Sequence, residues 1–258
     1  MDKNKKIVLL SGVGAEIAPL KTTHIGRIFR IDNFNPVLAF KEALLDGLLV
    51  SLGTKTKITE QDVDSLTVMD LRMLMFHIRL ISYPPNHVFN IVANWKDKDG
   101  NEFSDTTPIV VNESLMKAQY SAGANKDKPI YATYQDFLQK ERDYILPDSG
   151  FKVRLSLLLV KDLKREMDNE NASFLSIIKQ RNPVLVREDG EVESLVYDFE
   201  DRISSIMDLE FLFDKIFEQE GFAKVSIEIT NPKNPKQTQS ADLLSMPNFF
   251  FPSLSKLL

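Results

Sequence analysis

The chain of 258 residues contains no cysteine. Without thiols it can form neither disulfides nor thiolate metal sites, and it cannot use a cysteine nucleophile. Histidine is scarce as well, because only His24, His77 and His87 are present, and none of them has the HxxxH or HExxH spacing of a helical zinc site. The sequence therefore favours neither zinc nor redox chemistry, and we expect no metal and no cofactor.

Long hydrophobic runs and an excess of positive charge are also lacking. The longest apolar stretch, from Leu155 to Val160, is far shorter than the roughly 20 residues that span a bilayer. The run from Ile7 to Leu10 is too short for a signal peptide. The net charge of −5 does not favour binding to nucleic-acid phosphates. We therefore expect a soluble protein that binds neither membranes nor nucleic acid.

Catalytic motifs are missing too. The sequence has no GxxxxGK[ST] phosphate loop and no GxSxG elbow. Gly12-Val13-Gly14 follows an apolar stretch, but Ile17 stands where the dinucleotide-binding pattern needs glycine or alanine. Asp97 to Glu102 resembles a calcium loop, yet its glycine is fourth instead of sixth. We expect no enzyme. The competing hypothesis is an unrecognised carboxylate site, which requires a pocket with convergent acidic residues.

What the sequence does have is an internal repeat around the tripeptide Met-Asp-Leu. Met207 follows Met69 at an offset in residue number of 207 − 69 = 138, and the flanking apolar residues keep this offset. Each copy predicts an amphipathic helix, whose Met and Leu residues we interpret as core. Asp70 and Asp208 fall in the first helical turn, where a carboxylate can accept backbone N–H bonds. The alternative is an acidic contact to an arginine of a partner. The repeat indicates two similar parts of the chain.

Local signals indicate the remaining elements. Asp99-Gly100 and Asp189-Gly190 predict two β-hairpins. Thr59 and Thr67 are expected to cap helices, with Asp62 completing a capping box. A short helix is expected from Thr133 to Tyr144, a loop over 121–130, and a long polar turn from Asn231 to Gln239. We predict an α+β fold in two similar halves, 1–125 and 131–258, each with amphipathic helices and β-hairpins.

Three adjacent aromatic residues, Phe249, Phe250 and Phe251, precede Pro252 near the carboxyl end. Such a segment is expected to be an extended tail that buries alternate rings, because three consecutive side chains cannot share one face of a strand. The tail either folds onto its own core or docks into a neighbouring subunit. Exposure of all three rings in a monomer would favour association.

A longer pattern, LTxxDLxxLxxxIRxxSY followed by a hairpin and a late PxFF, resembles the T4-type phage baseplate hub proteins and their assembly-factor relatives. The resemblance covers roughly 35 to 110 and the tail. The matching residues are Leu66-Thr67, Asp70-Leu71, Leu74, Ile78-Arg79, Ser82-Tyr83 and Pro247-Asn248-Phe249-Phe250. Many family members carry cysteine pairs in the following hairpin, which suggests a zinc ribbon. The corresponding segment here, Asn90 to Phe103, has none, so Trp95 and Phe103 are expected to fill that space.

The resemblance implies a non-enzymatic structural component of a contractile-tailed phage baseplate, at or near the hub, which binds other tail proteins. It would reside in the virion, and in the host cytoplasm during assembly. The alternative is an assembly chaperone absent from the mature virion. Self-association is a second mode of binding left open. The candidate partner-binding residues are Phe249, Phe250, Phe251, Trp95, Arg79 and Tyr83.

Overall fold

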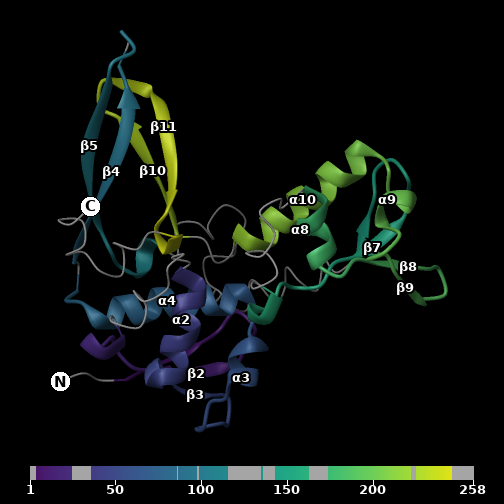
Figure 1. Ribbon diagram of the computed structural model, residues 1–258, viewed down its shortest axis with the longest axis horizontal. Helices are drawn as coiled ribbons and strands as arrows, with labels where there is room; N and C mark the ends of the chain where they lie inside the picture. The colour runs from purple at the N-terminus through teal and green to yellow at the C-terminus, as the bar shows by residue number, and fades with distance from the viewer. Residues whose placement is uncertain are drawn as a thin grey trace.

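A computed structural model describes residues 4–24, 36–85, 87–97, 99–115, 135, 143–162, 174–221 and 225–245. The fold combines helices with antiparallel sheets and several hairpins, which confirms the α+β class (Figure 1). The expected loop over 121–130 lies outside the described residues.

The elements of residues 5–110, which we call the first repeat, begin with a hairpin and end with a hairpin. Strands β1, β2 and β3 form one antiparallel sheet, and β4 and β5 form another. The elements are β1 Lys5–Val8, β2 Gly14–Ile17, α2 Pro36–Ala43, the π-helical turn η1 Leu44–Leu48, β3 Leu49–Leu52, α3 Glu60–Asp64, α4 Val68–Ser82, β4 Val88–Lys96 and β5 Glu102–Val110.

Residues 144–242, the second repeat, run through a similar order of elements, with an additional strand, β9, and an additional turn, η2. Strands β6, β7, β8 and β9 form one antiparallel sheet, and β10 pairs with β11. The elements are β6 Tyr144–Ile145, β7 Lys152–Arg154, the 3-10 turn η2 Val160–Asp162, α8 Phe174–Gln180, β8 Val184–Val186, β9 Val192–Ser194, α9 Phe199–Arg202, α10 Ile206–Gly221, β10 Ser226–Asn231 and β11 Asn234–Asp242, with the 3-10 turn η3 Leu243–Ser245 after them.

The repeat thus extends well beyond the Met-Asp-Leu helices. The starts of α2 and α8 are separated by the same offset as the two tripeptides (174 − 36 = 138), and so are the starts of α4 and α10 and of β4 and β10. In each repeat a hairpin leads to a helix, a strand that joins the hairpin sheet, a short helix, a long helix and a second hairpin. Because order, pairing and offset agree, the two parts share one fold.

The repeated aspartates make equivalent contacts. In the first repeat, the Ser11 N–H donates to Asp70 Oδ1 at 3.0 Å. In the second, the Ser149 N–H donates to Asp208 Oδ2 at 3.1 Å, and the Asp148 N–H donates to Oδ1 at 2.8 Å. Ser11 and Ser149 are again related by the offset of the repeat. Each carboxylate therefore holds the turn of the first hairpin of its repeat.

This contact revises the expected role of the two aspartates. We expected the carboxylates to accept backbone N–H bonds at the helix start, and they do, but the donors belong to the hairpin turns. The Asp70 N–H itself donates to the hydroxyl of Thr67, at 3.0 Å. Thr67 is the N-cap of α4, as predicted. The aspartates act across the fold, because each lies in the first turn of a helix whose start packs against a hairpin turn.

A second contact is repeated as an ion pair. Lys41 of α2 lies 2.9 Å from Glu60 and 2.6 Å from Asp64, both on α3. Lys179 of α8 is the equivalent of Lys41 at the same offset, and it lies 2.9 Å from Glu200 of α9. In both repeats a lysine on the first helix thus fixes the short helix that precedes the long one.

Buried apolar side chains form two clusters that do not follow the chain order. The first cluster contains the core of the first repeat and also Val160, Val225, Ile229, Leu243 and Leu244. The second comprises Tyr144, Leu146, Val153, Leu155, Ile178, Leu195, Phe199, Ile203, Leu212 and Ile216. The predicted division into 1–125 and 131–258 groups these residues differently, because the second hairpin of the second repeat packs with the first repeat.

The second hairpins of both repeats lie side by side (Figure 1). Gln239 Nε2 donates to the Asn94 carbonyl at 2.9 Å, which links β11 to β4. The inward side chains of β4 alternate with exposed ones, so that Phe89, Ile91 and Trp95 are buried. The first repeat therefore completes its core with a hairpin that follows α10 in the chain.

Most of the predicted local elements are confirmed. Thr59 and Asp62 form a capping box at α3. Gly100 and Gly190 lie in hairpin turns with φ of 85° and 86°, a conformation that glycine adopts without strain.

Two predicted elements are wrong. The expected polar turn from Asn231 to Gln239 is mostly the strand β11, whose central side chains are exposed and polar and so give no apolar alternation. Tyr144 was expected to end a helix but begins β6. The residues before Asp143 in that expected helix, apart from Gln135, lie outside the described part of the chain.

We predict that Asp208→Ala lowers the free energy of unfolding by about 1–3 kcal/mol, because two N–H groups of the hairpin turn lose their acceptor. Burial alone would raise the pKa of Asp208, but hydrogen bonds from Asp148 and Ser149 outweigh burial and lower this pKa. The carboxylate contribution is therefore present above the unfolded-state pKa and is lost as pH falls through the folded-state pKa.

Urea unfolding of both proteins at neutral and acidic pH measures this difference, which should shrink in acid. Asp214→Ala, on the exposed side of α10, is the matched control. Equal stabilities of the two variants at neutral pH would contradict the assigned role.

Candidate functional site

Arg79, Tyr83 and His87 meet at the carboxyl end of α4. The Arg79 guanidinium carbon lies 3.7 Å from the centre of the Tyr83 ring. Arg79 Nη2 lies 3.0 Å from His87 Nδ1, and the rings of Tyr83 and His87 are 4.9 Å apart. Two of the predicted partner-binding residues, Arg79 and Tyr83, are therefore in contact with each other, and Arg79 is itself 1% exposed.

The local sequence explains this cluster. Residues four apart on a helix share one side, so Arg79 lies below Tyr83 at the end of α4. Pro84-Pro85 then ends the helix, because proline cannot donate the next helical hydrogen bond. The chain turns back at His87, whose carbonyl accepts from the Val111 N–H at 3.2 Å as the hairpin begins.

Burial determines the charge states in the cluster. Burial lowers the pKa of Arg79 to about 10, although Tyr83 acts in the opposite direction. Burial raises the pKa of Tyr83, and burial together with Arg79 lowers the pKa of His87. At neutral pH the guanidinium is charged and both neighbours are neutral. Arg79 therefore donates to Nδ1 of a neutral imidazole and stacks on a neutral phenol.

An open pocket of about 230 Å³ lies beside this cluster. Arg79, His87 and Pro84-Pro85 line it, together with Lys5 and Glu113, which form an ion pair at 2.7 Å. Its walls combine apolar, cationic and ion-paired groups. Among the described residues that line it, Glu113 is the only acidic one, so these residues do not supply the convergent carboxylates that an unrecognised acidic site requires.

His77 lies on α4, two residues before Arg79, which lines this pocket. Burial lowers its pKa to about 4, helped by Lys5 and opposed by Glu113. Its Nδ1 is buried and has no hydrogen-bond partner among the described atoms. The His77 imidazole is therefore neutral at pH values well above about 4.

The other predicted partner-binding residues are placed differently. Trp95 is 2% exposed and belongs to the first buried cluster, so its side chain is not available for a contact at the surface. It packs in the same cluster as Phe103, as expected of the segment without cysteines. Phe249, Phe250 and Phe251 lie outside the described residues.

One apolar surface was missed by the sequence reasoning. Ile206 and Met207, at the start of α10, are 72% and 61% exposed. Met207 was interpreted as core because it matches Met69, which is 2% exposed. The interpretation is wrong for Met207, since the two helices share a fold but not the same neighbours.

Among the described residues no cluster of three or more His, Asp or Glu side chains could hold a metal ion. No described helix has the length and hydrophobicity to cross a bilayer.

We predict that replacing His77 with leucine makes the protein less sensitive to pH between about 6.5 and 4. A lowered folded-state pKa means that the unfolded chain binds the proton more readily in this window. The wild-type protein should therefore lose roughly 3 kcal/mol more stability on acidification than His77→Leu.

Urea unfolding of the two proteins at a series of pH values gives this difference directly. Other groups that titrate in the window cancel, because they are common to both proteins. Parallel pH profiles would show that His77 is not buried in its neutral form.

Comparison with protein-family models, curated proteins and solved structures finds no match. Function is therefore inferred from the repeat, from the surfaces described above and from the sequence resemblance.

Proposed function

We propose that the protein is a non-enzymatic structural component of a contractile-tailed phage baseplate, at or near the hub, where it binds neighbouring tail proteins. The observation that carries a binding role is the exposed apolar start of α10, with Ile206 and Met207. Large apolar side chains that are adjacent and exposed are typical of protein–protein contact surfaces. The baseplate assignment itself depends on the sequence resemblance.

The residues of the resemblance have defined roles in the fold, which supports a shared module. Thr67 caps α4, and Asp70 holds the turn of the first hairpin. Ser82 accepts the N–H of Leu20 at 2.8 Å, and Arg79 stacks on Tyr83. Because the matched residues stabilise the fold, the motif indicates a shared fold. Which proteins such a fold binds depends on its surface residues.

The alternative is an assembly chaperone that is absent from the mature virion. The same exposed surface would serve it, because a chaperone also binds its clients through apolar contacts. The two proposals differ only in whether the chain remains in the finished particle.

An affinity-tagged chain produced during phage infection should co-purify with tail proteins, and it should be present in purified particles. Mass spectrometry of both samples, with an untagged control, measures this. Enrichment with tail intermediates but absence from particles supports the chaperone. No enrichment of tail proteins over the control contradicts both proposals.

We predict that deletion of residues 247–258 leaves the chain folded but reduces its association with tail proteins, because the three phenylalanines would no longer reach a neighbour. Circular dichroism reports folding, and the co-purification described above reports association. Unfolding of the truncated chain would show that the tail belongs to its own core.

A further inference from the structure

We propose that the start of α10 is a docking site for an extended apolar segment with flanking basic residues, supplied by a different protein. The segment would occupy the place that residues 157–160 occupy at α4. This docking site follows from the internal repeat and requires no particular identity of the partner, so it stands apart from the baseplate proposal.

In the first repeat, residues 157–160 occupy the corresponding place beside the start of α4. The Val68 N–H donates to the Leu158 carbonyl at 2.9 Å, and the Val160 N–H donates to the Leu66 carbonyl at 2.9 Å. Between them Thr67 and Leu159 form an antiparallel bridge. An extended segment of the second repeat is thus added as a short strand beside the residues that lead into α4.

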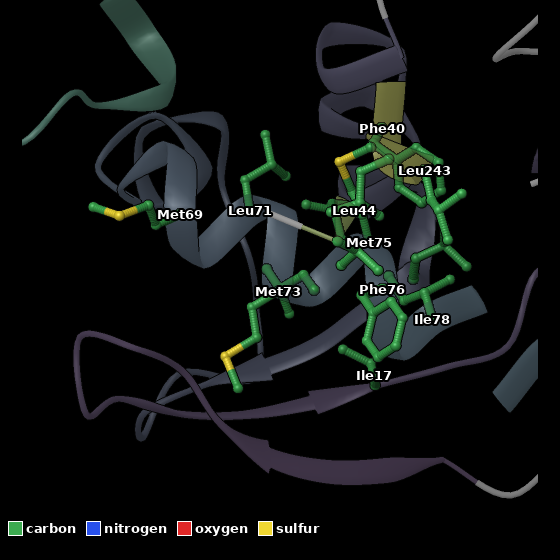
Figure 2. Close-up of a cluster of buried hydrophobic side chains, with 14 of the residues drawn as sticks. Ile17, Phe40, Leu44, Met69, Leu71, Met73, Met75, Phe76, Ile78 and Leu243 are labelled. Carbon is green, nitrogen blue, oxygen red and sulfur yellow. The ribbon is translucent and has the colours of Figure 1, made fainter. Parts of the chain in front are cut away.

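Residues 157–160 therefore cover the start of α4. Val160 is 1% exposed and belongs to the same buried cluster as Met69. Further along, Arg72 of α4 forms an ion pair with Asp242, and Leu243 after it is completely buried. Figure 2 shows Leu243 beside Phe40 and Met75 in this core. Both covers come from chain beyond the first repeat.

In the second repeat the corresponding place is open. Residues 204–207 correspond to residues 66–69 at the offset of the repeat. Within the described part of the chain no strand pairs with residues 204–206. Ile206 and Met207 are therefore exposed, while the equivalent Met69 is buried. Among the described residues, a strand therefore covers this position in the first copy and none covers it in the second.

The open surface continues along α10. Ile206, Glu210 and Phe217 are exposed and fall at i, i+4 and i+11, which places them on one side of the helix. Phe217 also stacks edge-to-face on Phe213, with ring centres 4.6 Å apart. The equivalent of Phe217 in α4 is Arg79, which is 1% exposed. An apolar stripe with acidic neighbours is thus presented where α4 is enclosed.

The negative charge around α10 favours a partner segment whose apolar part is flanked by basic residues. Residues 174–221 contain twelve Asp and Glu against five Lys and Arg, a net charge of −7. Glu210 and Asp214 lie on the exposed side of α10 itself. A partner segment with basic flanks would complement this field. The segment that fills the first copy has this composition, since Arg154 and Lys161 flank its leucines.

A second copy of the chain is a poorer occupant. Its own residues 157–160 are already paired with the start of its own α4. The residues at the equivalent place in the first repeat, 19–22, contain a single leucine. Pro19 has no N–H to donate to a neighbouring strand. The N–H of Leu20 is already donated to Ser82 Oγ. The observations therefore favour a different protein, and self-association becomes an outcome that the experiment can reveal.

A labelled peptide with the sequence of residues 153–161, VRLSLLLVK, is titrated with the full chain, and fluorescence anisotropy reports binding. We expect saturable binding, weakened about tenfold or more by the double variant Ile206→Glu/Met207→Glu. The matched control is Val192→Glu/Tyr197→Glu, which adds the same charge at exposed residues of the same repeat and should bind as the wild type does.

A charge variant provides an independent test. Glu210→Lys should also weaken binding, because it removes an acidic neighbour from the stripe. This variant keeps the apolar residues, so it tests the proposal even if the double variant loses its fold. Circular dichroism and urea unfolding establish that each variant is folded.

Three results would overturn the proposal. One is no saturable binding up to about 1 mM peptide, which is weaker than a specific contact provides. Another is equal binding to the wild type and to folded Ile206→Glu/Met207→Glu, which would place the peptide elsewhere. The third is a wild-type dimer in sedimentation that becomes a monomer in the double variant, which would make a second copy the occupant.

Discussion

The contact on which both repeats depend is the hydrogen bond from a hairpin turn to an aspartate in the first turn of the long helix. Asp70 accepts the Ser11 N–H, and Asp208 accepts those of Asp148 and Ser149. Both carboxylates are almost fully buried, so leaving them without the turn amides would be costly. The contact fixes the first hairpin against the helix start, and the remaining elements of each repeat are arranged around this pair.

Around that common frame, the two repeats differ in what completes them. The first receives a strand from residues 157–160 and a hairpin from residues 226–242, and its long helix is enclosed. The second keeps a small core of its own, with α10 buried along one side through Leu212 and Ile216. The long helix of the first repeat, α4, is therefore enclosed, while α10 of the second repeat stays accessible on one side.

Sequence reasoning predicted the elements that follow from local chemistry. Caps at Thr59 and Thr67 and turns at Gly100 and Gly190 depend on neighbouring residues and were found. It missed β11, because a strand with exposed polar side chains on both faces has no apolar alternation to detect. It also wrongly predicted that Met207 is buried. Helical spacing shows which residues share one side of a helix, but it does not show whether a distant segment covers that side.

The Arg79 cluster and the α10 surface illustrate two consequences of duplication. At the position shared by Arg79 and Phe217, the first copy has a buried cation stacked on Tyr83, whereas the second has an exposed aromatic ring. A buried guanidinium needs neighbours that donate electron density or accept hydrogen bonds, and Tyr83 and His87 provide both. Phe217 stacks on Phe213 of its own helix and is still 44% exposed. The enclosed copy therefore buries this position completely, whereas the open copy presents apolar side chains, Ile206 and Met207 above all, to solvent.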